Sequence, residues 1–273
     1  MSWQPAISPI GMFDSGVGGL SVFQAVRRLM PAQPVIYLAD QAHVPYGPRP
    51  MSEVRRFSED ITRYLLEQGA RLIVVACNTA SAAALHHLRE VLPEVPFVGM
   101  EPAVKPAAEG THTRRVGVLA TPATFQGELY ASVVERFAGD VILYQDTCPG
   151  LVGEIEAGRL DGEAARAILE RAIRPMLAAG IDTIVLGCTH YPFAIPLIES
   201  IAGPGVRVID PAPAVARQAR RLLTVRGWLS TDGRGPVRFL TTGDPAAFES
   251  LLPQLKIEPG AVEQVQVPVT QNG

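Results

Sequence analysis

The sequence predicts an α/β protein with two similar parallel-sheet lobes, related by a pseudo-twofold axis, and an active site in the crevice between them. Short apolar runs alternate along the chain with longer segments of helical periodicity. Similar segments also recur at a nearly constant spacing, which indicates an internal duplication. With 273 residues, 47% hydrophobic and 19% charged, the chain can bury two cores and is not a disordered protein.

The elements follow from these patterns in chain order. The predicted strands are short apolar runs bounded by turn residues, at 9–13, 35–39, 72–76, 97–100, 116–120, 141–144, 183–186 and 207–209. The predicted helices have apolar residues at helical spacing, at 21–30, 52–68, 80–92, 124–137, 162–179 and 213–224. Another helix begins at Asp244-Pro245, because an N-cap residue followed by proline is a typical helix start.

The duplication pairs three segments of the first half with three of the second. It sets Asp14 opposite Thr121, Cys77 opposite Cys188, and Glu101-Pro102 opposite Asp210-Pro211, at offsets of 107, 111 and 109 positions. We therefore expect residues 1–101 plus 211–273 to form the first lobe, with the last segment returning to it, and residues 102–210 to form the second lobe.

Composition excludes several classes of function. The formal net charge of −3 provides no basis for binding nucleic acid or an acidic membrane surface, and no apolar run approaches the roughly 20 residues of a membrane span. The N-terminal residues lack the basic and apolar segments of a signal peptide, and the three cysteines are an odd, small number, so we expect reduced thiols in the cytoplasm. Only Lys105 and Lys256 are lysines, which argues against a pyridoxal phosphate enzyme and its Schiff-base lysine.

Cys77 and Cys188 are the strongest candidates for catalysis. Each follows a predicted strand and precedes a helix or turn, where backbone N–H groups and the helix dipole favour a thiolate. Two thiols on opposite sides of one carbon could invert a stereocentre, one removing a proton and the other delivering one. A buried cysteine at a strand end is otherwise a packing residue, and the duplication is what favours the catalytic interpretation.

Polar residues accompany both cysteines. Asp14 ends the first strand, and His190 follows Cys188 by two positions. Each side chain could orient a thiol or relay its proton. Alternatively, Asp14 could cap a helix or stand in a turn, and His190 could be an ordinary hydrogen-bonded loop histidine. The segment DSGVGGLSV lacks the spacing of a dinucleotide or P-loop motif and predicts a tight turn whose N–H groups suit a carboxylate. Further donors for a small anion are Pro45-Tyr46-Gly47, Asn78-Thr79 and Thr189 with His190.

Six segments taken together resemble the glutamate racemase family: DSGVGGLSV, ADQAHVPYG, VACNTASA, VGMEPAVKPA, VLGCTHYPF and TTGDPAAF. They cover nearly the whole chain in the family's order. The resemblance implies a racemase that interconverts L- and D-glutamate for peptidoglycan synthesis, with no cofactor and no metal. It also implies Cys77 and Cys188 as the acid/base thiols and Asp14 and His190 as their assistants.

The resemblance also implies substrate contacts from Asp14, Ser15, Tyr46, Gly47, Asn78, Thr79, Thr189 and His190. Glu156 is the best match to a family glutamate that follows a CP-containing segment, here CPGLVGEIEAG, although the wording around it differs. LATPAT likewise departs from the family's wording at Thr121 and Thr124, the remaining candidate ligands. Cys148 is interpreted as structural.

Other functions stay open at this point. The protein could be a related racemase or decarboxylase that acts on aspartate or another dicarboxylate. It could also hydrolyse a substrate with Cys188 as nucleophile and His190 as base, or bind glutamate without turnover. A metal module of Cys77, Cys188 and His190 is a further alternative, although Cys-x-His is not a usual zinc spacing. The partner we expect is a small-molecule substrate, and the sequence leaves open whether the chain forms a homodimer.

Overall fold

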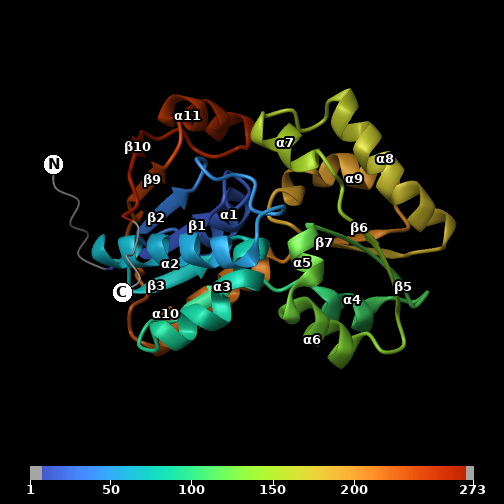
Figure 1. The fold of residues 1–273 in the computed structure, drawn as a ribbon, viewed down its shortest axis with the longest axis horizontal. Helices are drawn as coiled ribbons and strands as arrows, with labels where there is room; N and C mark the ends of the chain where they lie inside the picture. The colour runs from blue at the N-terminus through green and yellow to red at the C-terminus, as the bar shows by residue number, and fades with distance from the viewer. Residues whose placement is uncertain (1–7, 269–273) are drawn as a thin grey trace.

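The computed structural model describes residues 8–268, so the ends of the predicted first lobe, 1–7 and 269–273, lie outside it. The chain forms two α/β lobes that lie side by side, each with a parallel sheet covered by helices (Figure 1). This is the predicted fold class. Within residues 8–268, no helix combines the length and the apolar character that a membrane span requires.

The first lobe is built on a six-stranded parallel sheet in the order β10-β9-β2-β1-β3-β4. Its strands are β1 (Ile10–Asp14), β2 (Val35–Ala39), β3 (Leu72–Val75), β4 (Phe97–Gly99), β9 (Val237–Thr241) and β10 (Val262–Gln264). Its helices are α1 (Leu20–Leu29), α2 (Met51–Glu67), α3 (Asn78–Val91), α10 (Ala212–Val225) and α11 (Pro245–Gln254). The C-terminal strands β9 and β10 extend the sheet beyond β2, so the end of the described chain packs on the lobe where the chain begins (Figure 1).

The second lobe has a four-stranded parallel sheet in the order β6-β5-β7-β8. Its strands are β5 (Arg115–Ala120), β6 (Ile142–Asp146), β7 (Thr183–Gly187) and β8 (Arg207–Ile209). Its helices are α4 (Val104–Gly110), α5 (Pro122–Gln126), α6 (Glu128–Phe137), α7 (Leu151–Glu156), α8 (Glu163–Ala178), the 3₁₀ turn η1 (Tyr191–Ala194) and α9 (Ile195–Ala202). The order β6-β5-β7-β8 repeats β2-β1-β3-β4, as the duplication predicts.

The inner strands β1, β2, β3 and β7 are buried on both faces, which explains why they read as continuous apolar runs. In β1, Ile10 and Met12 join one core of the first lobe, whereas Phe13 points to the other face. In β7, Ile184 and Leu186 face one core of the second lobe and Val185 faces the other. Because strands in a parallel sheet share one direction, their carboxyl ends meet at one edge, where ligands bind in such sheets.

Two predictions about helices have instructive outcomes. Asp244 is the N-cap of α11: its side chain accepts a hydrogen bond of 2.9 Å from the Ala246 N–H, and Pro245 occupies the first turn, as predicted. The single helix predicted at 124–137 is wrong, because α5 ends and α6 begins at Gly127, whose backbone is extended. A Cβ on Gly127 would lie 2.8 Å from Ala82 of α3, so the break permits a close approach between the lobes.

Candidate active site

A cavity of about 280 Å³ collects residues from both lobes, including both candidate thiols. Its size is near the lower end of the roughly 300–1,000 Å³ typical of ligand pockets, which suits a small substrate. The lining residues are Ser15, Pro45, Tyr46, Gly47, Pro48, Cys77, Asn78, Thr79, Thr121, Pro122, Thr147, Cys148, Pro149, Gly150, Val152, Cys188, Thr189, His190 and Tyr191.

Cys77 stands just after β3 and is the N-cap of α3, where its sulfur accepts a hydrogen bond from the Ala80 N–H at 3.4 Å. Its side chain also shares a hydrogen bond with the carboxyl of Asp14, the last residue of β1. Burial raises the pKa of the Cys77 thiol well above its usual value, and the negative charge of Asp14 raises it further. The thiol form of Cys77 is therefore the stable form when the cavity holds no ligand.

Cys188 follows β7 and has a different neighbour. Its sulfur lies 3.7 Å from Nδ1 of His190, and Nε2 of the same ring lies 2.5 Å from Oε1 of Glu156 in α7. Burial opposes a positive charge on His190, but its hydrogen bonds to Cys188 and Glu156 prevail and hold the pKa of the ring well above its usual value. Burial likewise opposes the Glu156 charge, but His190 keeps the pKa of that carboxyl below its usual value. Cys188, His190 and Glu156 thus form a chain of contacts, called the relay below, that favours the protonated form of the His190 ring.

The turn between β1 and α1 contacts both carboxylates. The N–H groups of Gly16 and Gly19 donate to Oδ2 of Asp14 at 3.2 and 3.0 Å, and the Val17 N–H donates to Oε1 of Glu156 at 2.8 Å. A Cβ on Gly16 would collide with Glu156, and one on Gly18 with His190. The turn that the sequence predicts for a carboxylate therefore holds two of the protein's own carboxylates, and its glycines allow the relay of the other lobe to approach.

Other contacts also join the lobes at the cavity. The hydroxyl of Thr189 lies 3.4 Å from Oδ1 of Asp14, and the Ser21 hydroxyl donates to the Thr189 carbonyl at 2.9 Å. In addition, Oγ1 of Thr79 is 3.0 Å from Oγ1 of Thr121, which is 2.9 Å from Oγ1 of Thr124. These hydrogen bonds tie the lobes together at two places.

Asn78 lines the cavity with its polar groups unpaired. The side chain is 3% exposed, and among the residues that the structure describes, neither its amide nitrogen nor its amide oxygen has a hydrogen-bond partner. Buried polar groups are nearly always paired, so an unpaired amide at a cavity wall indicates a polar ligand that completes it. Asn78 is therefore placed to bind a carboxylate or an ammonium group.

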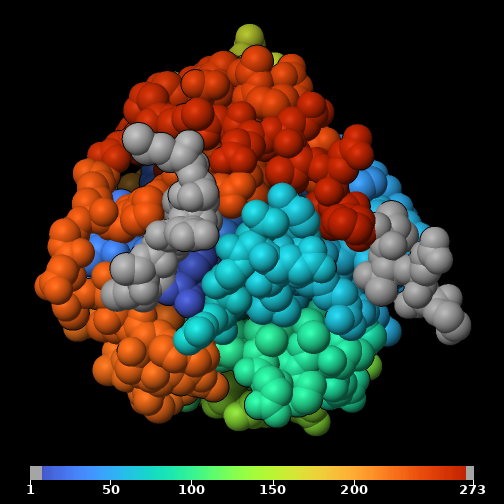
Figure 2. Space-filling model, turned by 90° about the vertical axis from the view of Figure 1, so that its left-hand side faces the viewer, coloured from blue at the N-terminus to red at the C-terminus, as the bar shows by residue number. Residues whose placement is uncertain are grey.

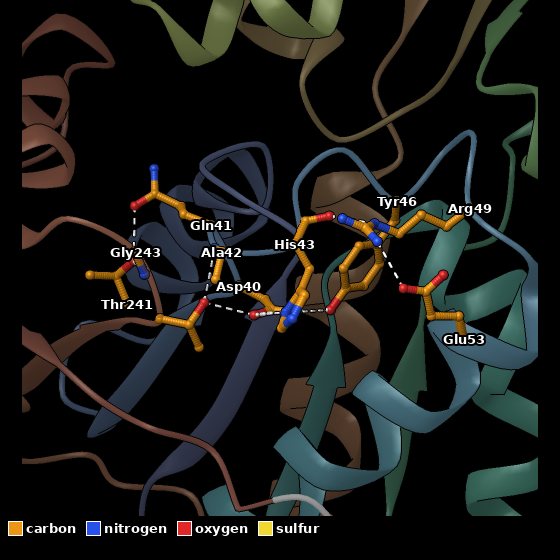
Figure 3. Close-up of polar contacts among 10 residues, drawn as sticks. Asp40, Gln41, Ala42, His43, Tyr46, Arg49, Glu53, Thr241 and Gly243 are labelled. Atoms are coloured by element: carbon orange, nitrogen blue, oxygen red, sulfur yellow. Dashed lines mark hydrogen bonds and ion pairs between the residues drawn. The ribbon is translucent and has the colours of Figure 1, made fainter.

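Tyr46 forms part of the wall on the Cys77 side, and Asp40 holds its hydroxyl. Figure 3 shows the side chains of Asp40, His43 and Tyr46 close together, with dashed lines that join Asp40 to the other two. The Tyr46 hydroxyl donates to Oδ2 of Asp40 at 2.5 Å, His43 Nδ1 lies 2.9 Å from Oδ1, and the Thr242 hydroxyl donates to Oδ1 at 2.7 Å. Asp40 is 1% exposed, and it connects the cavity wall to the C-terminal segment that follows β9.

The structure brings the predicted site residues together in two layers. Eleven of them line the cavity: Ser15, Pro45, Tyr46, Gly47, Cys77, Asn78, Thr79, Thr121, Cys188, Thr189 and His190. Asp14, Thr124 and Glu156 do not line it but bond to Cys77, Thr121 and His190, respectively. Cys148, interpreted as structural, is buried in a core of the second lobe and also reaches the cavity wall.

Sequence reasoning missed Asp40, although its position carried a signal. It follows β2 directly, much as Asp14 ends β1 beside it. It also missed the Thr147–Gly150 wall and Tyr191, whose hydroxyl donates to the Thr147 carbonyl at 3.0 Å. Within the described part of the chain, no group of three or more His, Cys, Asp or Glu side chains is arranged to hold a metal ion.

Known proteins share this sequence and architecture. The family model for Asp/Glu/hydantoin racemase matches residues 18–219. A glutamate racemase of Pseudomonas paraeruginosa is 50% identical over 248 residues, 91% of this chain and 94% of the relative. The solved glutamate racemase of Escherichia coli, in complex with L-glutamate and the activator UDP-MurNAc-ala, is 32% identical with a TM-score of 0.83, over 96% of this chain and 99% of that one.

A Francisella tularensis glutamate racemase in complex with D-glutamate is 30% identical with a TM-score of 0.83, over 95% of this chain and 98% of that one. These likenesses extend over both lobes and the cavity between them. The family model covers well over half of the chain, and the similar relatives are matched almost end to end. The chain therefore belongs to the Asp/Glu/hydantoin racemase family.

Proposed function

We propose that the protein is an isomerase that interconverts L- and D-glutamate by proton transfer at Cα, with Cys77 and Cys188 as the two acid/base groups and no cofactor. The observation that carries the proposal is that the two cysteines, placed after equivalent strands of the two lobes, line one small cavity. Relatives about 50% identical are glutamate racemases, and similar solved structures contain L- or D-glutamate.

In the resting enzyme, we assign Cys188 as the base and Cys77 as the acid. The sulfur of Cys188 contacts the positively charged His190 ring, whereas the Cys77 thiol beside Asp14 keeps its proton. Cys188 takes the Cα proton and becomes a thiol, and Cys77 gives its proton to the opposite face and becomes a thiolate. The product is the other enantiomer, and the two sulfurs have exchanged protonation states, ready for the reverse reaction.

The α-proton of an amino acid is weakly acidic, so the site must stabilise charge that develops on the α-carboxylate. Asn78 supplies an unpaired amide at the cavity wall, and the hydroxyls of Ser15, Thr79 and Thr189 lie in the same lining. We assign these groups to the substrate's polar ends. The side-chain carboxylate of glutamate then acts as a remote handle that holds Cα between the sulfurs.

Incubation with L- or D-glutamate in heavy water, without added cofactor, tests the proposal. We expect both enantiomers to appear from either one, each new molecule carrying deuterium at Cα, when chiral chromatography is combined with mass spectrometry. Retention of the starting enantiomer without deuterium uptake would exclude racemisation. Parallel incubation with aspartate tests the dicarboxylate alternative. If the cavity of about 280 Å³ is fitted to glutamate, the protein should racemise aspartate more slowly than glutamate.

The Cys188–His190 contact is also what a cysteine hydrolase needs, so this second function has an observation in its favour. An acyl-enzyme on Cys188 in mass spectra would support hydrolysis, whereas deuterium uptake at Cα would support racemisation.

We further propose that the enzyme works in the cytoplasm, where its three cysteines, all free in the structure, stay reduced, and that its D-glutamate enters peptidoglycan. Rescue of growth in a bacterium that requires added D-glutamate tests that role.

A further inference from the structure

A second cavity, of about 530 Å³, lies on the first lobe and shares no lining residue with the catalytic cavity. It is formed by α1, by the segment from Arg234 through β9, and by the segment after α11. In Figure 2 the orange and red C-terminal segments rim a hollow in which blue N-terminal atoms are visible. Its lining residues are Phe23, Gln24, Arg27, Arg28, Arg234, Val237, Phe239, Lys256, Ile257, Glu258, Pro259 and Gly260.

The charge of this lining is opposite to that of the whole chain. Four cations, Arg27, Arg28, Arg234 and Lys256, converge from three segments, and the lining contains one carboxylate, Glu258. Lys256 is one of just two lysines in a chain whose formal net charge is −3. The lining therefore carries a local excess of three positive charges at neutral pH.

The cations are incompletely neutralised by the protein itself. Glu258 forms an ion pair with Arg234, with both side chains largely exposed, and the Asp210 carboxylate acts on Arg28 from outside the lining. Burial lowers the pKa of Arg27, and the nearby positive charge of Arg234 lowers it further. Positive charges that act on one another in this way favour a bound anion, because an anion would relieve their repulsion.

Hydrogen bonds to backbone groups hold together the three segments that carry these cations. Nη1 of Arg27 donates to the carbonyl of Pro31 at 2.9 Å, and the Gly235 N–H donates to the same carbonyl at 3.0 Å, which brings Arg234 next to α1. Nε2 of Gln24 donates to the Leu255 carbonyl at 2.8 Å and thereby joins the Lys256 segment to the same helix. The three segments are thus held around one space.

The floor of the cavity is apolar. Phe23 and Phe239 pack edge to face with ring centroids 5.3 Å apart, and Val237 and Ile257 complete the surface beside them. A ligand that uses both parts of the cavity must carry an anionic group for the rim and an apolar ring for the floor. Guanidinium groups match phosphate oxygens in geometry and charge, so phosphate suits the rim better than a single carboxylate does.

From this arrangement we propose that the second cavity binds a small organic phosphate with an apolar ring, of the size of a mononucleotide. The anionic group lies among Arg28, Arg234 and Lys256, and the ring lies on the floor beside Phe239. The site is separate from the thiols, and the proposal does not depend on what the catalytic cavity transforms.

The test uses AMP as the probe and isothermal titration calorimetry of the full chain at physiological salt, where nonspecific surface attraction is largely screened. The test variant is the triple substitution Arg28→Gln, Arg234→Gln and Lys256→Gln. The matched control is Arg217→Gln, Arg220→Gln and Arg221→Gln on α10. It removes three cations from another hollow, of about 320 Å³, whose lining has no aromatic residue among those described.

We expect AMP to bind the unaltered protein, the test variant to bind about tenfold or more weakly, and the control variant to bind within about twofold of the unaltered protein. Neutral adenosine should bind more weakly than AMP, because it lacks the group that the rim recognises. Absence of AMP binding at millimolar concentration would overturn the proposal. Equal weakening in both variants would also overturn it, since general positive charge would then explain the binding. Unchanged racemisation and melting temperature show that the variants are folded.

Discussion

The two halves of the catalytic cavity share a scaffold but differ in chemistry. Cys77 follows β3 and Cys188 follows β7, which are equivalent strands of the repeated sheet order. Beside Cys77 stands the carboxyl of Asp14, in direct hydrogen-bond contact with the thiol. Beside Cys188 stands the ring of His190, with the carboxylate of Glu156 behind it. The first half favours a neutral thiol, and the second provides a positive partner for sulfur.

The two lobes thus share their strand order, while the connections that follow the strands differ. Equivalent strands place the residues that follow them at equivalent positions in the two lobes. The side chains at these positions differ, because Asp14 is the last residue of β1 whereas its counterpart Thr121 is the N-cap of α5. The carboxylate of the second half comes instead from α7. In the mechanism proposed above, this asymmetry sets which sulfur starts as base and which as acid in the free enzyme.

The largest expected effect comes from removing either sulfur. Cys77→Ser and Cys188→Ser should each lower glutamate racemisation by about 10³-fold or more, because a serine hydroxyl is a far weaker acid than a thiol and does not ionise near neutral pH to act as the base. Chiral chromatography of the product measures this loss. Each variant should still exchange deuterium into one enantiomer, and the two variants should prefer opposite enantiomers, since each retains the thiol of one face.

Cys148→Ser is the matched control for these substitutions. Burial and the nearby Asp146 charge raise the pKa of Cys148, so its thiol stays protonated and is not assigned a proton to transfer. We expect less than a tenfold loss of turnover. A loss as large as in the other two variants would contradict the assignment of the acid/base pair.

The next effect separates the two assistants. His190→Asn removes the positive charge beside Cys188 and should lower kcat by about 10²-fold or more, within the usual range for an acid/base assistant. Asp14→Asn should cost less, because an amide oxygen can still accept from the Gly19 N–H and a neutral thiol needs no counter-charge. Steady-state kinetics in both directions measures the difference, and equal losses would show that the halves are not specialised.

The protonation states give a sharper test. The pKa of His190 is raised, so the ring keeps its positive charge as pH rises and loses it only above that pKa. Glu156→Gln removes one of the groups that raise the pKa of His190. This variant should therefore lose activity on the alkaline side of the pH profile at a lower pH than the unaltered protein. Asp14→Asn removes a charge that raises the Cys77 pKa, so this thiol should ionise at lower pH. Iodoacetamide labelling, read site by site in mass spectra, should be faster at Cys77 in Asp14→Asn and slower at Cys188 in Glu156→Gln. Faster labelling of Cys188 in Glu156→Gln would contradict the relay.

Sequence patterns predict the scaffold better than the relay, for a physical reason. A buried parallel strand must be apolar on both faces, so β2 and β7 appear as unbroken runs and were predicted within one residue of their ends. The six-residue helix α7 follows Pro149-Gly150 and is too short for a helical period to emerge, so it was not predicted. Glu156 was identified through resemblance alone.

The contacts between residues far apart in the sequence could not be predicted from local pattern. Glu156 meets Val17 across 139 positions of sequence, and Asp40 meets Thr242 across 202. Such pairs depend on how the lobes and the C-terminal segment pack, which no periodicity encodes. The glycines at 16 and 18 did mark a tight turn, but their reason, the close approach of Glu156 and His190, became visible only in the folded chain.

The smallest effect compares the two tyrosines of the cavity wall. The Tyr46 hydroxyl donates to the buried Asp40 carboxylate, whereas the Tyr191 hydroxyl donates to the Thr147 carbonyl. Hydrogen bonds to charged groups contribute about 1.5–3 kcal/mol and neutral ones about 0.5–1.5 kcal/mol, so Tyr46→Phe should destabilise the protein more than Tyr191→Phe. Urea unfolding measures both. His43 and Thr242 still hold Asp40 in Tyr46→Phe, so the lobe should stay folded. In this variant the KM for glutamate should rise a few-fold, while kcat changes little. A greater loss of stability in Tyr191→Phe would mean that the wall on the Cys188 side is the more strongly anchored one.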